Sequence, residues 1–298
     1  KMENPVQKYS ANIDSYYEFN HLITALAQTL GEGYAIHKQD VFVRKQFKDE
    51  SNDNHEFLSE SYFKYFNGRS YTDSQTYLII TQENKKSRIF SFDSKKWRDF
   101  LVKIRKVKDQ LKDSGVEASY LDGNTAREYV DRYFSMNFND KIMSMTNFKV
   151  DEESIFMGNK RCKVYSLVDV DCVSTPSIVR PFTNIEVNNV SMPVDMVSLV
   201  DSIPSADVVV YNQMFFIPNQ KRELSLLDKK KNRHASMPNP SNLIAVEDIK
   251  KVLDVIAREN KQLVYAHFNL VVGTSIDADI QKCTNHLENS FGRLGIHI

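Results

Sequence analysis

Residues 37–40, His-Lys-Gln-Asp, bring together an imidazole, an ammonium, an amide and a carboxylate. Such groups carry out general acid–base chemistry when they converge on one substrate. An apolar Val-Phe-Val run follows directly, so the sequence predicts a strand, in which side chains alternate between two faces. His37 and Gln39 should share one face, and Lys38 and Asp40 the other, where these two can pair. The quartet therefore predicts a structural strand.

Metal-binding patterns are weak. Asp169 and Asp171 are two residues apart in "VDVDC" and could hold a cation from one strand face, although a solvated strand edge is the simpler interpretation. Cys162, Cys172 and Cys283 are widely spaced, with no Cys-x-x-Cys or His-Glu-x-x-His motif, and are interpreted as buried thiols. We therefore assign no metal ligand.

Nucleotide-binding and nucleophile motifs are absent from the sequence. It has neither Gly-x-x-x-x-Gly-Lys-[Ser/Thr] nor Gly-x-Gly-x-x-Gly, and no Gly-x-Ser-x-Gly elbow. His267, within "VYAHFNLVV", is interpreted as a buried, hydrogen-bonded strand residue, with a catalytic base as the alternative. We predict no catalytic or cofactor-binding residue, and an unfamiliar enzyme site around His37, Asp40 or His267 stays open.

A basic run, "DKKKNRH" (228–234), ends a predicted helix, where cations favourably meet the negative end of the helix dipole. The alternative is a phosphate contact of a nucleic-acid-binding module, which would normally add interleaved aromatic residues. The candidate phosphate contacts are Lys229, Lys230, Lys231 and Arg233.

The elements that must position these residues follow from hydrophobic periodicity. Helices are expected near 14–30, 55–67, 94–113, 124–135, 194–202, 219–234, 243–260 and 276–293, and strands near 35–47, 76–81, 154–158, 161–170, 207–217 and 262–272. Uneven links and adjacent strands near residue 160 favour an α+β fold, with mixed or antiparallel sheets packed with helices. We predict two subdomains, residues 1–140 and 141–298.

Composition narrows the class of protein. The 298 residues contain 39 Lys and Arg and 39 Asp and Glu, so no overall field favours nucleic acid or an anionic membrane. Three cysteines favour a reducing compartment, and no apolar run approaches the roughly 20 residues that span a bilayer. We expect a cytoplasmic protein.

The predicted helix near 55–67 has more apolar residues than one buried stripe needs. Leu58, Tyr62 and Tyr65 could face inward, while Phe63 and Phe66 lie partly on another side. The surplus predicts a second buried surface, such as a contact with another protein. The candidate protein-contact residues are Tyr62, Phe63 and Phe66.

Four longer segments carry a family resemblance: "IHKQDVFVRKQF" (36–47), "FLSESYFKYFNGRSYTDSQTYLIIT" (57–81), "VVYNQMFFIPNQKRELSLLDKKK" (209–231) and "YAHFNLVV" (265–272). In kind, order and spacing they resemble the N-terminal region of the TraG-type conjugative-transposon ATPases of Bacteroides-like bacteria. That family is similar to the large cytoplasmic ATPase of type IV secretion systems.

The resemblance implies that this chain precedes a C-terminal ATPase domain, which would bind ATP and Mg²⁺. The region itself would be a non-catalytic docking or assembly domain of the DNA-transfer machinery, needing no cofactor of its own. Its partners would be membrane components of the conjugation channel or other subunits. The full-length protein would form homo-oligomers and lie in the cytoplasm, peripheral to the inner membrane.

Overall fold

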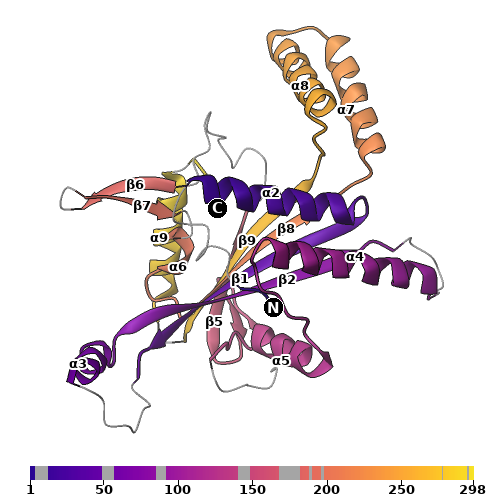
Figure 1. Cartoon of the computed structure of the whole chain (residues 1–298). Helices are drawn as coiled ribbons and strands as arrows, with labels where there is room; N and C mark the ends of the chain where they lie inside the picture. Colours follow the sequence, from indigo (N-terminus) through magenta and orange to yellow (C-terminus); the bar gives the residue numbers. More distant parts are fainter. Residues whose placement is uncertain are drawn as a thin grey trace.

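The computed structural model describes residues 1–3, 13–48, 57–84, 92–139, 148–167, 182–187, 190–195, 198–276, 278–293 and 295–298 (Figure 1). The fold is α+β, as the sequence predicted, and a seven-stranded sheet of order β2-β1-β8-β9-β5-β4-β3 organises it. Every ladder of this sheet is antiparallel.

The strands are β1 (Tyr34–Gln46), β2 (Ser70–Gln82), β3 (Lys149–Val150), β4 (Ile155–Met157), β5 (Lys160–Ser166), β6 (Phe182–Val187), β7 (Val190–Asp195), β8 (Val208–Phe216) and β9 (Tyr265–Ser275). The helices are α2 (Ile13–Leu30), α3 (Phe57–Phe66), α4 (Ser94–Asp113), α5 (Gly123–Phe134), α6 (Ser198–Asp201), α7 (Gln220–Ala235), α8 (Pro240–Glu259) and α9 (Ile280–Gly292). The separate hairpin of β6 and β7 was not predicted.

Strand β1 joins the two predicted subdomains. It pairs with β2 along its whole length and with β8 on its other side. Lys38, for example, lies opposite Leu78 of β2 and Gln213 of β8. Strands from before and after residue 140 therefore form one hydrogen-bonded sheet. The division into 1–140 and 141–298 does not separate two sheets, because the backbone groups of β1 are satisfied from both segments.

Helices α2 and α4 pack on one face of the sheet (Figure 1). Leu26, Leu30 and Leu111 are buried there with Ile36 of β1. Farther along the same face, Phe42 packs in a second cluster beneath α6 and α9. Period-two alternation places these β1 residues on one side of the strand, as the sequence pattern required.

Helix α5 and the chain after it cover part of the opposite face. Met136 and Phe138 pack there on Val41, Val43 and Val210. One central sheet thus separates two apolar layers. The polar quartet of β1 belongs to this sheet and lies between the apolar clusters on its two faces.

Helix α4 has the bounds that the sequence predicted. Asp93 caps its first turn by accepting hydrogen bonds from the backbone N–H groups of Lys95 and Lys96, at 3.0 and 3.1 Å. These bonds hold the pKa of the Asp93 carboxyl below its usual value, because they favour the charged form. Within the described ranges, no helix is long and apolar enough to cross a bilayer.

Candidate docking surfaces and the polar centre of the sheet

The quartet divides between the two faces of the sheet, as alternation predicted. Lys38 Nζ contacts Asp40 Oδ2, and both residues are buried. Thr76 Oγ1 donates to Asp40 Oδ1 at 2.8 Å, and Gln213 Nε2 donates to Oδ2 at 2.9 Å. The buried carboxylate therefore has an ammonium and two neutral donors, which is the satisfied geometry of a structural ion pair.

On the opposite face, His37 and Gln39 meet Asn212. His37 Nε2 lies 3.0 Å from Asn212 Oδ1, and Gln39 Nε2 donates to the same oxygen at 2.7 Å. Asn212 Nδ2 donates in turn to Asn269 Oδ1 at 2.7 Å. This amide network fixes the side chains of three neighbouring strands.

His267 ends this network at the surface. Its Nε2 lies 3.3 Å from Asn269 Nδ2, but the residue is exposed, so the prediction of a buried histidine is wrong. The reason is that the α5 layer covers only part of this face. Asp40 lies across the sheet from both His37 and His267, so the three groups considered for an enzyme site do not converge.

Neither described cysteine resembles a metal ligand or a nucleophile. Cys162 and Cys283 are buried, and burial raises the pKa of Cys162 to about 12, so its thiol stays protonated at neutral pH. Among the described residues, no three His, Cys, Asp or Glu side chains are grouped to hold a metal ion. Cys172 and the pair Asp169 and Asp171 lie outside the described residues.

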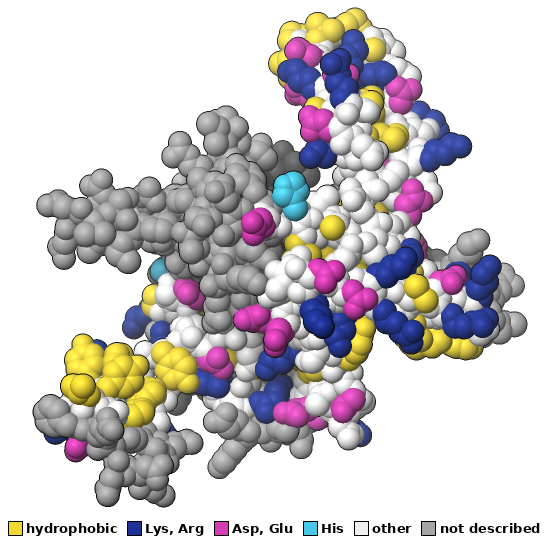
Figure 2. All heavy atoms as spheres, viewed as in Figure 1, with side chains coloured by type: hydrophobic (Ala, Val, Ile, Leu, Met, Phe, Trp, Pro, Cys, Tyr) yellow, Lys and Arg dark blue, Asp and Glu magenta, His cyan; other side chains and the backbone are white. Residues whose placement is uncertain are grey.

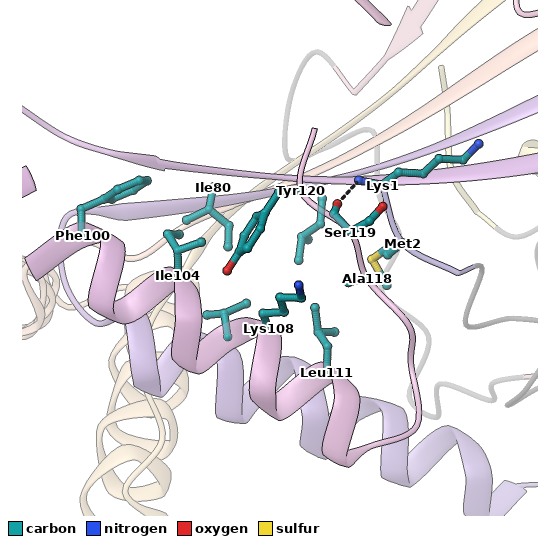
Figure 3. A pocket seen from close by; sticks show the side chains of 12 residues that line it. Lys1, Met2, Ile80, Phe100, Ile104, Lys108, Leu111, Ala118, Ser119 and Tyr120 are labelled. Atoms are coloured by element: carbon teal, nitrogen blue, oxygen red, sulfur yellow. Dashed lines mark hydrogen bonds between the residues drawn. The ribbon is translucent and has the colours of Figure 1, made fainter. Parts of the chain in front are cut away.

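A pocket of about 180 Å³ opens between α4 and β2 (Figure 3). Its walls are mainly apolar, from residues such as Ile80, Phe100 and Ile104. At its rim, Lys108 Nζ lies 4.6 Å from the centre of the Tyr120 ring. The volume is below the roughly 300 Å³ at which drug-sized ligand sites begin.

Helix α3 lies at the far end of the β1–β2 hairpin, away from the helices that cover the sheet (Figure 1). We define the aromatic tip as Phe47, Tyr62, Phe63, Tyr65 and Phe66. The Phe47 ring centre is 5.9 Å from that of Phe63 and 6.3 Å from that of Phe66, and Tyr62 lies 4.6 Å from Phe66. Hydrophobic side chains cover this end of the molecule in Figure 2.

The structure divides the candidate contact residues of the aromatic tip. Phe63 and Phe66 are half-buried against Phe47, whereas Tyr62 and Tyr65 are 56% and 59% exposed. The expectation that the tyrosines face inward is therefore wrong, because Phe47, which follows β1, supplies the inner surface. Phe63 and Phe66 form the base of the tip, and the tyrosines form its outer face.

Helices α7 and α8, which were predicted near residues 219–234 and 243–260, form an arm that projects from one end of the sheet (Figure 1). Neither helix has a buried residue. Gln220 holds the base of the arm: its Nε2 donates to the carbonyl oxygens of Pro218 and Leu263, at 3.0 and 2.9 Å, and its Oε1 accepts from Leu263 N at 2.8 Å.

The four basic candidates on α7 do not form one cluster. Lys229, Lys230 and Arg233 are exposed, but Lys231 is half-buried and its Nζ lies 2.5 Å from an Asp228 carboxylate oxygen. Adjacent lysines on a helix point about 100° apart, which a run of letters does not show. Three of the four predicted phosphate contacts remain open to an anion.

Excision of the arm is expected to leave the sheet folded. Replacing residues 219–262 with a short Gly-Ser linker removes no buried side chain, and Pro218 and Leu263 already lie close together. We expect the free energy of unfolding to change by less than about 1 kcal/mol. Urea denaturation followed by circular dichroism measures this, and loss of cooperative unfolding would show that the arm is part of the core.

No protein-family model matches the chain, and no curated protein matches it with significant similarity.

Proposed function

We propose that this chain is the non-catalytic docking domain of a conjugative-transfer ATPase of the TraG type. In this proposal it works in the cytoplasm, peripheral to the inner membrane, as part of a homo-oligomer. ATP and Mg²⁺ bind to a C-terminal domain outside this sequence, and this region positions that motor against membrane components of the channel. The resemblance to the TraG-type ATPases supports the assignment of this chain to the DNA-transfer machinery.

The aromatic tip is the observation that carries the docking role. Tyr62 and Tyr65 expose large apolar rings at the end of a projecting hairpin, where they add little to the core. The Arg69 guanidinium lies 3.6 Å from the centre of the Tyr65 ring, which holds this side chain in place. Tyrosine and arginine in a fixed arrangement are typical of protein-interface hot spots.

Replacing both tyrosines tests the docking surface. We expect Tyr62→Ala with Tyr65→Ala to weaken binding to the relevant channel component by about 30-fold or more, since interface hot spots contribute roughly 2 kcal/mol or more. Binding is measured by biolayer interferometry between the chain and the purified cytoplasmic regions of each channel membrane protein. Transfer frequency from donor cells carrying the full-length variant should fall in parallel.

Tyr120 provides a matched control, because it is also 56% exposed but lies beyond α4, at the pocket rim. Tyr120→Ala should bind the channel component like the native chain. Native binding by the Tyr62→Ala, Tyr65→Ala variant would exclude the aromatic tip as the contact. Failure of the native chain to bind any channel component would contradict the docking function itself.

A further inference from the structure

The distal end of the arm, residues 229–246, carries charge of one sign. It contains Lys229, Lys230, Lys231 and Arg233, and no Asp or Glu until Glu247, so its formal charge is four positive and none negative, or +4. The whole chain is neutral, with 39 basic and 39 acidic residues. The distal arm is therefore a local concentration of positive charge on a neutral protein.

Three of these cations are available to a partner. Lys229, Lys230 and Arg233 are exposed, and across the described part of the chain no carboxylate forms an ion pair with any of them. At 100° per residue they lie on one broad stripe of α7, together with Leu226, which is also exposed. The half-buried residues Leu227 and His234 lie on another side of α7, where His234 Nδ1 contacts Asn242 of α8, so an extended anionic surface can approach the stripe.

The end of the arm is apolar. Met237 is 70% exposed, Leu243 58% and Ile244 62%. These side chains form a cap over the α7–α8 turn, which appears as the hydrophobic end of the arm in Figure 2. Apolar side chains next to exposed cations form a different surface from a solvated basic helix.

The turn beneath this apolar cap is held by its own hydrogen bonds. Asn242 Nδ2 donates to Met237 O at 2.6 Å, and Asn242 N donates to Asn239 Oδ1 at 2.8 Å. His234 Nδ1 lies 2.8 Å from Asn242 Oδ1. Because polar groups of the turn satisfy one another, the apolar side chains are presented outward by a fixed backbone.

We propose that the distal arm binds the surface of an anionic lipid bilayer. Met237, Leu243 and Ile244 enter the boundary between headgroups and acyl chains, while the cations of α7 contact lipid phosphates. Basic helices with an apolar face bind membranes in this way, and each Lys or Arg near an anionic surface adds to the attraction. This inference goes beyond the docking function, which places the protein contact on α3.

Two other occupants fit less well. Single-stranded nucleic acid binds through stacking on aromatic side chains as well as through cations, and residues 220–264 contain no Phe, Tyr or Trp. A second copy of the arm would bring two ends of charge +4 together, which is unfavourable. The aliphatic cap and its cations match a bilayer in both polarity and charge.

Vesicle co-sedimentation of the whole chain tests the inference. The probes are phosphatidylcholine vesicles with and without phosphatidylglycerol, at low and high salt. The native chain should bind only the anionic vesicles, and less at high salt. Lys229→Glu, Lys230→Glu, Arg233→Glu should weaken binding by about 100-fold or more, and Met237→Ser, Leu243→Ser, Ile244→Ser by about tenfold.

Three exposed basic residues of α4 provide the charge-matched control. Lys95→Glu, Arg105→Glu, Lys106→Glu changes the net charge by the same amount, away from the arm, and should keep vesicle binding within about twofold of native. The Tyr62→Ala, Tyr65→Ala variant should bind vesicles like the native chain, which separates this proposal from the docking function.

Several outcomes would overturn the lipid proposal. One is a native chain that does not bind anionic vesicles at low salt, and another is native affinity in either arm variant. Equal weakening by the α4 control would show that vesicle binding depends on net charge and not on the arm. If vesicles do not bind but a single-stranded oligonucleotide does, and the arm charge reversal abolishes that binding, the arm contacts nucleic acid instead.

Discussion

Replacing Lys38 with methionine is expected to lower the free energy of unfolding by about 3–5 kcal/mol. Methionine keeps much of the volume of the side chain but removes the ammonium that contacts Asp40. The carboxylate then stays in a buried site with only Thr76 and Gln213 as donors. Urea denaturation followed by circular dichroism measures the loss, and the folded variant should keep the native spectrum.

The matched control is the ion pair at the other end of β1. Lys45 Nζ lies 2.8 Å from an Asp73 carboxylate oxygen, but both side chains are partly exposed, so Lys45→Met should cost less than about 1 kcal/mol. Adding Asp40→Asn to Lys38→Met should recover part of the lost free energy of unfolding, because neither position 38 nor position 40 then carries a buried charge. Equal small losses in the Lys38 and Lys45 variants would show that solvent reaches Asp40.

Local patterns predicted the elements that depend on neighbouring residues. Helix α4 was predicted within its bounds because apolar spacing is a local pattern, and the structure adds a cap at Asp93 and a left-handed glycine at 115 just beyond its end. The division of the 37–40 quartet was predicted because strand alternation is a local property of the backbone. Both inferences needed no knowledge of what packs nearby.

Pairing between distant segments was not predicted. Nothing in "AIHKQDVFVRKQF" indicates that its second neighbour is β8, because the partner strand begins more than 160 residues later. The predicted boundary at residue 140 therefore lies between strands that share one sheet. The orientation of α3 was missed because the deciding partner, Phe47, lies outside the periodic segment.

The candidate sites show the same limit. The sequence identified the residues of the aromatic tip and the basic run, since aromatic and cationic clusters are visible as letters. It did not show that Tyr62 is exposed while Phe63 is half-buried, or that Lys231 is paired while Lys229 is open. Exposure depends on the element that packs against each helix, and that element comes from elsewhere in the chain.

At Gly158 the backbones of the two halves of the chain lie close together. This glycine lies in the turn between β4 and β5 at a φ of +61°, against the end of α5. A Cβ atom added there would lie 2.5 Å from the backbone oxygen of Ser135, the C-cap of α5. The close contact is between two backbones, so no side chain can rotate to relieve it.

Gly158→Ala is therefore expected to lower the free energy of unfolding by about 3–5 kcal/mol, combining left-handed backbone strain with overpacking. Gly68→Ala is the matched control, because Gly68 has a φ of +77° but nothing within 4 Å of an added Cβ, so only the strain of about 1–2 kcal/mol should remain. Urea denaturation of both variants measures the difference. Equal losses would mean that α5 moves away from the β4–β5 turn at little cost.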